Sequence, residues 1–420
     1  MFDKIIDLIS NEKNIIIFGD LVLDKYVEIT SSRLSSETII PVMKPEKKYS
    51  FLGCAGNVAK IINEFNCNVF LISIIGKNLK TIENICVEEN INIDYSIINK
   101  DVNQSKKRYI HNNQQYFRID NCDNIDYQKY KIQIEDNFKN CIQKNNIDMI
   151  IIPDYNLGLC DDLSNIIEIA KENNIKIVID PHGNDIMKYK GCNLFKPNKN
   201  ELQQLTNINI KNNNDLIKSA EKIINVIDCD IIVTTLGSAG IFVYEKNGKS
   251  NIISTKKINF IDVCGAGDTI NSIISLGLIS ELSIEDVCKI ANIFASIFIK
   301  KIGTSKMYFY EILNVSHNRL ECTAFEVTVF LAARVSVTAL DAHNICLMFI
   351  GLSYLSMPLG ISIAASIRVG NLLGALNKNR FYDLHSISTK NVGVISGDIV
   401  YVVAHRYPDA TPFIHKCHRE

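Results

Sequence analysis

Short apolar runs alternate with amphipathic stretches along the first 300 residues. Five runs are rich in β-branched residues without polar alternation, and they cover residues 14–19, 69–76, 148–154, 176–180 and 230–237. Continuous apolar strands of this kind are typical of a parallel sheet that is covered on both faces. Between them, residues 163–173 and 214–227 have the spacing of amphipathic helices. This repeated order predicts an α/β fold with a doubly wound sheet.

Two segments depart from this order and predict a second, smaller sheet. Residues 39–51 have the pattern of a strand pair, and residues 106–120 indicate two strands joined by a turn at Asn112 and Asn113. We expect a small β-lid built from about residues 39–52 and 104–120. Because ligands bind at the carboxyl edge of open α/β sheets, the lid is expected to cover a site there.

The composition of the chain changes near residue 310. The first 300 residues contain eight alanines, and residues 321–375 alone contain another eight. Residues 344–367 then form a run of 24 without a charge. As a helix this run would extend about 36 Å, enough to cross a hydrocarbon core of about 30 Å. The preceding stretch, 323–340, carries two charges that disfavour a membrane span.

These shifts predict two segments of different origin. We expect a first domain over residues 1–305, a junction over 306–322, and an unrelated apolar helical tail that begins at 323. Contact with a membrane is expected only through residues 344–367.

Charge and cysteine usage narrow the function classes. The formal net charge of −1 argues against a nucleic-acid binder, which normally has a strong basic bias. Thirteen cysteines are scattered with no CxxC pair, which is typical of reduced thiols in the cytoplasm. The first apolar run leads directly into Gly19 and Asp20, so it predicts a buried strand and not a signal peptide.

The strongest local signal is a glycine-rich motif before a helix-compatible run. The motif Gly265-Ala266-Gly267-Asp268 would let backbone amides approach an anion, while the helix adds its positive N-terminal dipole. Asp268 could then take a proton from a hydroxyl while these amides stabilise a transferred phosphoryl group. The structural alternative is an ordinary glycine turn with an aspartate cap.

Two further motifs offer groups for a sugar. Asp20 and Asp24 follow the first strand and are expected to share one loop, where they could hold hydroxyl groups. Gly53 and Asn57 supply a tight backbone and an amide side chain at a helix start. Capping of a helix or turn remains the alternative for Asp20 and Asn57.

A third group of residues is suited to a nucleotide. Asn198 and Glu201 open a helix and face one side, where they could position Mg²⁺ near ATP phosphates, with Glu201 acting through water. The alternative is a capping box between the two. Thr235, Gly237 and Gly240 end a strand with small residues that suit contact with a flat nucleotide.

In this order and spacing, the motifs resemble the phosphofructokinase-B or ribokinase-like carbohydrate kinases over about residues 12–305. Within that family the chain is most similar to the heptose 7-phosphate kinases, through the segments 32–37, 106–108, 113–120 and 154–158. The resemblance implies that Asp24, Gly53 and Asn57 bind the sugar, Asn198 to Glu201 the ATP phosphates, and Asp268 acts as the base. It implies phosphorylation of the anomeric hydroxyl of D-glycero-D-manno-heptose 7-phosphate; another sugar or a nucleoside is the alternative acceptor.

Basic residues of the predicted lid fit a phosphorylated substrate, because guanidinium forks match phosphate geometry. The lid residues predicted to bind the substrate are Arg33, Lys106, Arg108, Gln115 and Arg118. A solvated hairpin face is the alternative, and the lid could also join two copies into a homodimer.

The sequence also departs from the family. Cys54, Cys264 and Leu157 stand where glycine, threonine and lysine are common. The HxGH motif of the nucleotidyltransferase domain found in bifunctional relatives is absent, so no adenylyltransferase activity is expected.

The tail resembles a different family. Residues 323–385 are similar to about two of a dozen helices of the multidrug and toxic compound extrusion transporters, and residues 386–420 match nothing. Two helices cannot build an alternating-access path, so transport is not expected. A cytoplasmic kinase, with membrane association only through the tail, is the main hypothesis; a membrane protein with a vestigial kinase part is the alternative.

Overall fold

The computed structural model describes residues 12–111, 114–255, 265–280 and 282–299. These residues all belong to the first of two compact units, which covers residues 1–316. The predicted tail, its uncharged run at 344–367 and Cys264 therefore lie outside the described residues. Within the described part, no helix is both long and apolar enough to cross a membrane.

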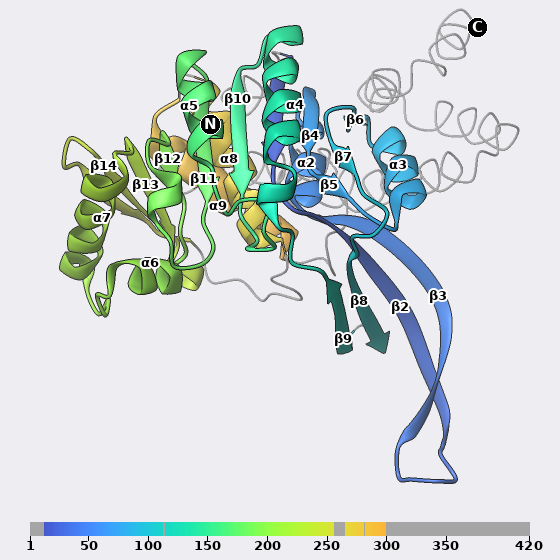
Figure 1. Ribbon diagram of the computed structural model, residues 1–420. Helices are drawn as coiled ribbons and strands as arrows, with labels where there is room; N and C mark the ends of the chain where they lie inside the picture. Colours follow the sequence, from blue (N-terminus) through green and yellow to red (C-terminus); the bar gives the residue numbers. More distant parts are fainter. Residues whose placement is uncertain (1–11, 112–113, 256–264, 281, 300–420) are drawn as a thin grey trace, which may run out of the picture. The chain divides into compact units, whose positions relative to one another are not determined.

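A nine-stranded sheet forms the centre of this unit (Figure 1), in the order β15-β14-β13-β12-β11-β10-β1-β4-β6. Neighbours from β13 to β6 pair in parallel, and β14 and β15 add antiparallel strands at one edge. The strands are β1 Lys13–Phe18, β4 Cys67–Ile72, β6 Ile91–Asn92, β10 Met149–Pro153, β11 Lys176–Asp180, β12 Leu194–Phe195, β13 Ile231–Thr235, β14 Ile241–Glu245 and β15 Ser250–Ile253. The predicted doubly wound α/β fold is confirmed as a mixed sheet.

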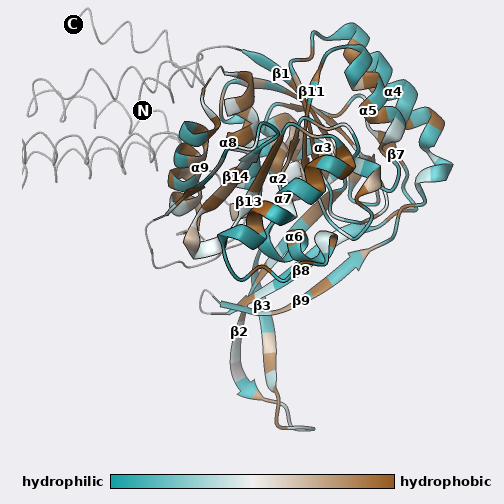
Figure 2. Cartoon of the chain, turned by 90° about the vertical axis from the view of Figure 1, so that its left-hand side faces the viewer, coloured by the Kyte–Doolittle hydropathy of each residue, from teal (hydrophilic) through white to brown (hydrophobic). Residues whose placement is uncertain are grey.

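Helices cover both faces of the sheet. The helices are α2 Ala55–Asn63, α3 Leu79–Glu88, α4 Lys131–Lys144, α5 Ser164–Glu172, α6 Lys199–Thr206, α7 Asn213–Ile227, α8 Ala266–Ile279 and α9 Ile284–Phe298. Side chains of α2, α3, α8 and α9 pack in one hydrophobic cluster, and those of α4 to α7 pack in another. Ile15 and Ile17 of β1 enter the first cluster and Ile16 and Phe18 the second. Figure 2 shows the hydrophobic strands between helices with hydrophilic outer faces.

Three short 3₁₀ turns and a two-stranded ribbon complete the described elements. The ribbon consists of β5 Ile74–Ile75 and β7 Ile97–Ile98. The 3₁₀ turns are η1 Tyr127–Lys129, η2 Met187–Tyr189 and η3 Gly237–Ala239.

The predicted lid is present as a four-stranded sheet, but its strands differ from those expected. Its order is β3-β2-β8-β9, from β2 Leu21–Leu34, β3 Pro41–Cys54, β8 Gln104–His111 and β9 Gln114–Cys122. The prediction of a strand pair over 39–51 was wrong, because this segment is one strand that pairs with β2. Asp24 therefore lies on a strand and not on a loop with Asp20. Figure 1 shows β2 and β3 as a long ribbon that extends away from the helices.

Candidate active site

Asp268 lies in the first turn of α8 and is held by two donors from other elements. Its Oδ2 accepts a hydrogen bond from Asn57 Nδ2 at 2.6 Å, and its Oδ1 accepts one from the Tyr155 hydroxyl at 2.5 Å. Burial raises the pKa of the Asp268 carboxyl, while these two hydrogen bonds oppose the rise. The carboxylate therefore has a fixed orientation at the N-terminus of the helix.

The start of α8 requires glycine. Gly265 is the N-cap with φ 83°, a left-handed conformation, and a Cβ there would lie 2.7 Å from the Phe298 ring. Gly267 is exposed, and apart from its chain neighbours and the adjacent backbone of its own helix no described atom lies within 4 Å of its Cβ position. The predicted anion-binding residues Gly265, Ala266 and Gly267 thus form the first turn around Asp268, where backbone amides of a helix attract an anion.

The lid contributes a buried ion pair. Asp24 of β2 and Arg108 of β8 lie 2.6 Å apart between Oδ1 and Nη1, and their side chains are 6% and 9% exposed. A Cβ on Gly53 would lie 2.5 Å from Asp24 Oδ2, so glycine at this position gives the carboxylate its space. Arg108 also lies over the Tyr26 ring, at 5.3 Å. The guanidinium predicted to bind substrate phosphate is therefore already bound to Asp24.

Lys106 is a lid residue that lies near side chains next to Asp268. It lies on the same face of β8 as Arg108, because the two are two residues apart in a strand. Its Nζ lies 3.8 Å from Cys54 Sγ and 6.0 Å from the centre of the Tyr155 ring. Cys54 has φ 54°, which is unusual for a residue other than glycine, and burial raises the pKa of its thiol.

Asp20 has a different position from the one predicted. It has no exposed surface, and its two oxygens accept hydrogen bonds from the backbone amides of Leu157 and Leu159. Burial raises the pKa of the Asp20 carboxyl to about 7, while these bonds oppose the rise. A completely buried carboxylate cannot contact a sugar, so the prediction of a direct contact is corrected: Asp20 holds the loop that carries Tyr155.

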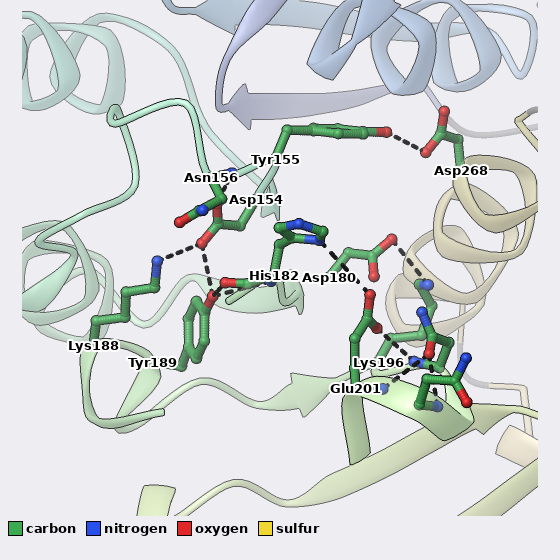
Figure 3. A network of polar contacts seen from close by, with 12 residues as sticks. Asp154, Tyr155, Asn156, Asp180, His182, Lys188, Tyr189, Lys196, Glu201 and Asp268 are labelled. Atoms are coloured by element: carbon green, nitrogen blue, oxygen red, sulfur yellow. Dashed lines mark hydrogen bonds and ion pairs between the residues drawn. The ribbon is translucent and has the colours of Figure 1, made fainter. Parts of the chain in front are cut away.

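The same loop is fixed from its other side by a buried polar network (Figure 3). Asp154 Oδ1 accepts from the Asn156 amide at 2.7 Å. Its Oδ2 accepts from the Tyr189 hydroxyl at 2.7 Å and pairs with Lys188 Nζ at 2.6 Å. The Asp154 side chain has no exposed surface. Tyr155 is thus placed by groups that do not themselves face the base.

Asn198 and Glu201 form the capping box that was the structural alternative. Asn198 Oδ1 accepts from the Glu201 amide at 3.0 Å, and Glu201 Oε2 accepts from the Asn198 amide at 2.7 Å. Glu201 Oε1 lies 3.9 Å from His182 Nδ1, and this contact raises the pKa of His182. An isolated bridge joins Asn198 to Thr235, which places the two predicted nucleotide motifs side by side.

The turn after β13 depends on glycine. Gly237 and Gly240 have φ values of 60° and 102°. A Cβ on Gly240 would lie 2.1 Å from the Ile253 carbonyl oxygen, so a side chain cannot be accommodated there. This small-residue turn follows Thr235 at the carboxyl end of its strand.

Lys196 and Asp180 are site residues that the sequence analysis did not select. Lys196 Nζ lies 2.9 Å from Asp180 Oδ2, and the lysine side chain is 3% exposed (Figure 3). Burial raises the pKa of Asp180 to about 7, and Lys196 opposes this rise. The charge of Lys196 also opposes the rise that burial causes in the pKa of Asp268. Both residues stand at carboxyl ends of parallel strands, a signal that could have identified them.

The carboxylates on this side fit a water-mediated magnesium ion. Glu201 and Asp180 interact electrostatically, and carboxylate oxygens are ligands that Mg²⁺ accepts together with several waters. No group of three or more metal-ligating side chains occurs among the described residues. A site that relies on ATP phosphates and water fits this small donor set.

Three predicted lid residues are not brought together with the others. Arg33 is exposed near the end of β2, nine residues beyond Asp24, or about 30 Å along a strand. Gln115 and Arg118 are exposed on β9. Arg118 forms two hydrogen bonds with Asp120, at 2.7 and 2.9 Å.

The fold and the site together define the chain as a phosphotransferase. The fold is a doubly wound sheet with a β-lid, and the site has a carboxylate at a glycine-capped helix and a separate turn suited to a nucleotide. The family model described as pfkB family carbohydrate kinase matches residues 12–308. This chain belongs to the pfkB family of carbohydrate kinases, which are ATP-dependent sugar kinases. A second family model, MatE, matches residues 315–411; it agrees with the resemblance of the tail, but it extends into residues 386–411, for which the sequence analysis found no match.

Curated relatives agree with this family. Bifunctional protein HldE of Aliarcobacter butzleri (strain RM4018) is 33% identical over 341 residues, covering 78% of this chain and 71% of the relative. HldE of Haemophilus influenzae (strain PittEE) is 28% identical over 315 residues, covering 74% and 65%. This chain therefore spans about two thirds of the length of these relatives.

Solved structures show the same fold. Phosphofructokinase-2 from Escherichia coli, in complex with potassium, has a TM-score of 0.58 at 18% identity, covering 70% of this chain and 94% of that chain. Ribokinase from Arabidopsis thaliana, complexed with ribose and ATP, has a TM-score of 0.54 at 14% identity, also covering 70% and 94%.

Proposed function

We propose that this kinase transfers the γ-phosphoryl group of ATP to the anomeric hydroxyl of D-glycero-D-manno-heptose 7-phosphate, giving the 1,7-bisphosphate. The observation that carries the proposal is the convergence of Asp268, Asn57, Tyr155 and Lys106 at the N-terminus of α8. The choice of sugar rests on the motif resemblance to heptose 7-phosphate kinases and on the similarity to HldE proteins.

Asp268 acts as the general base. Its carboxylate takes the proton of the anomeric hydroxyl while the sugar oxygen forms a bond to the γ-phosphorus and the bond to the β-phosphate oxygen breaks. The amides of Gly265, Ala266 and Gly267 stabilise the negative charge of the transferred group. Asn57 holds the carboxylate at Oδ2 and so fixes the direction of proton transfer.

The lid selects a phosphorylated sugar through Lys106. This lysine lies close to the base through its contacts with Cys54 and the Tyr155 ring, and an ammonium group attracts phosphate as a point charge. Arg108 acts indirectly, because its pair with Asp24 fixes β8 against β2. Asp24 and Gly53 then shape the sugar side of the site.

The nucleotide binds on the side of α6 and the turn after β13. Asn198, Glu201, Thr235, Gly237 and Gly240 border this region. Glu201 would hold water molecules bound to Mg²⁺, and the ion would neutralise the negative charge of the phosphates. Lys196 adds a positive charge that pairs with Asp180 and also acts on the base.

A coupled assay of ADP release with the full-length chain tests the proposal. Heptose 7-phosphate should be a better substrate than unphosphorylated heptose, fructose 6-phosphate or ribose. The substitution Lys106→Ala should raise the KM for heptose 7-phosphate. A charge-assisted contact of about 1.5–3 kcal/mol predicts a rise of tenfold or more. An enzyme that prefers unphosphorylated sugars and does not respond to Lys106→Ala would contradict the heptose-phosphate proposal.

The lid also offers a surface for a second copy of the chain. Tyr116, Phe117 and Ile119 of β9 are 57%, 42% and 42% exposed, and β9 is an edge strand of its sheet. A homodimer through the lid would cover these side chains. Light scattering should then report a dimer for the full chain and a monomer for Phe117→Lys; a monomeric wild type would contradict this assembly.

The kinase and the tail are separate domains. The pfkB family model ends at residue 308 and the MatE model begins at 315, which supports a junction within 306–322. The nine cysteines in the described part are free, which fits an enzyme of a reducing cytoplasm.

A further inference from the structure

Two side chains from different parts of the chain hold the Asp268 carboxylate. Asn57 comes from α2 and donates at 2.6 Å, and Tyr155 comes from the loop after β10 and donates at 2.5 Å. A carboxylate has about four acceptor positions, so each oxygen keeps one for a substrate hydroxyl. The Tyr155 hydroxyl therefore limits the orientations of the base without occupying it completely.

The loop that carries Tyr155 is fixed on both sides of this residue. Before it, Asp154 accepts from the Asn156 amide and pairs with buried Lys188. After it, the buried carboxylate of Asp20 accepts from two backbone amides of the loop. Such a network reduces the freedom of Tyr155, and hence of the contact with Asp268.

The ring of Tyr155 makes a second contact, with the lid. Lys106 Nζ lies 6.0 Å from the ring centre, at the limit of an attractive cation–π contact. The Tyr155 side chain thus bonds to the base and lies beside the cation proposed to receive the sugar phosphate.

We infer that Tyr155 is a positioning residue for phosphoryl transfer: its hydroxyl orients the Asp268 carboxylate toward the sugar, and its ring supports Lys106. The inference rests on the proposed function, because it takes Asp268 as the base. The proton of the sugar hydroxyl passes to Asp268, and Tyr155 keeps its own proton throughout. A hydrogen bond to the charged form of a carboxylate favours that form, so Tyr155 keeps the base ionised at lower pH.

Other groups also act on the base and are unchanged when only the Tyr155 hydroxyl is removed. Burial and the negative charge of Asp24 disfavour the ionised form of Asp268, whereas Asn57 and the positive charge of Lys196 favour it. Among the described residues, the groups that act on Asp268 are Asn57, Tyr155, Lys196, Asp24, Asp180 and Cys54.

The test compares Tyr155→Phe with wild type in the full-length chain, through kcat/KM for the accepted sugar from about pH 5 to about pH 9. The acid limb should move to higher pH by about one unit, since a hydrogen bond to a charged group is lost. Substrate phosphates titrate near about pH 6 in all variants alike, so they cancel in the comparison. Tyr244→Phe is the matched control, because its hydroxyl also donates to a carboxylate, Glu221, at 3.0 Å.

Tyr155→Leu separates the two contacts, since it also removes the ring beneath Lys106. It should raise KM for the sugar phosphate above the value of Tyr155→Phe, with KM for ATP unchanged. Equal loss of rate at every pH in Tyr155→Phe, with an unmoved acid limb, would overturn the inference. Failure of the proposed function is seen separately, as near-wild-type turnover of Asp268→Asn or as rejection of heptose 7-phosphate by the wild type.

Discussion

The ion pair between Arg108 and Asp24 leads to a stability prediction that separates a structural role from substrate binding. The charged atoms are 2.6 Å apart and the side chains are 9% and 6% exposed. Arg108→Ala leaves the Asp24 carboxylate buried without this partner, and breaking such a pair costs about 3–5 kcal/mol. For a domain of this size, roughly 2–3 °C per kcal/mol gives a fall in Tm of roughly 6–15 °C.

Thermal unfolding of the full-length chain measures this effect. The chain has no tryptophan, so far-ultraviolet circular dichroism is the suitable signal. Arg118→Ala is the matched control, because its pair with Asp120 is 44% and 40% exposed and should contribute less than about 1 kcal/mol. An unchanged Tm for Arg108→Ala, together with a raised KM for the sugar phosphate, would show that Arg108 contacts the substrate and refute the structural role.

Three further predictions follow from the site and the domain boundary. Asp268→Asn should lower kcat by about 10²–10⁴-fold and retain ATP binding in calorimetry, whereas near-wild-type turnover would exclude Asp268 as the base. Burial raises the pKa of Asp20 from 3.8 to about 7. Protonation of Asp20 therefore stabilises the folded state at low pH, and this stabilisation is lost as the pH rises through the window from about 3.8 to about 7. The Tm of wild type should therefore fall relative to Asp20→Asn across that window, and a constant difference would contradict the raised pKa. Residues 1–310 should retain the kinase activity of the full chain and give a higher soluble yield; an insoluble, inactive 1–310 fragment beside a soluble full chain would contradict the boundary.

The central sheet was predictable because its strands are buried on both faces. In β1, Ile15 and Ile17 face one hydrophobic cluster while Ile16 and Phe18 face the other, which requires an uninterrupted apolar run. The lid was predicted less well. Strand β2 is polar at many positions and follows β1 after only Gly19 and Asp20, so its sequence resembles a loop. Its pairing with β3 depends on contacts between segments that local patterning does not encode.

The candidate site likewise combines features that the local sequence specifies with contacts between residues that are far apart in the chain. The glycines around Asp268 are local features, since the left-handed conformation at Gly265 restricts the residue type. The partners of Asp268 are not local: Tyr155 and Asn57 are 113 and 211 residues away along the chain. The sequence does indicate which residues lie at the carboxyl ends of parallel strands, and Tyr155, Asp180 and Lys196 all lie there. Because those ends meet at one edge of the sheet, polar residues that follow apolar runs are candidate site residues before any contact is known.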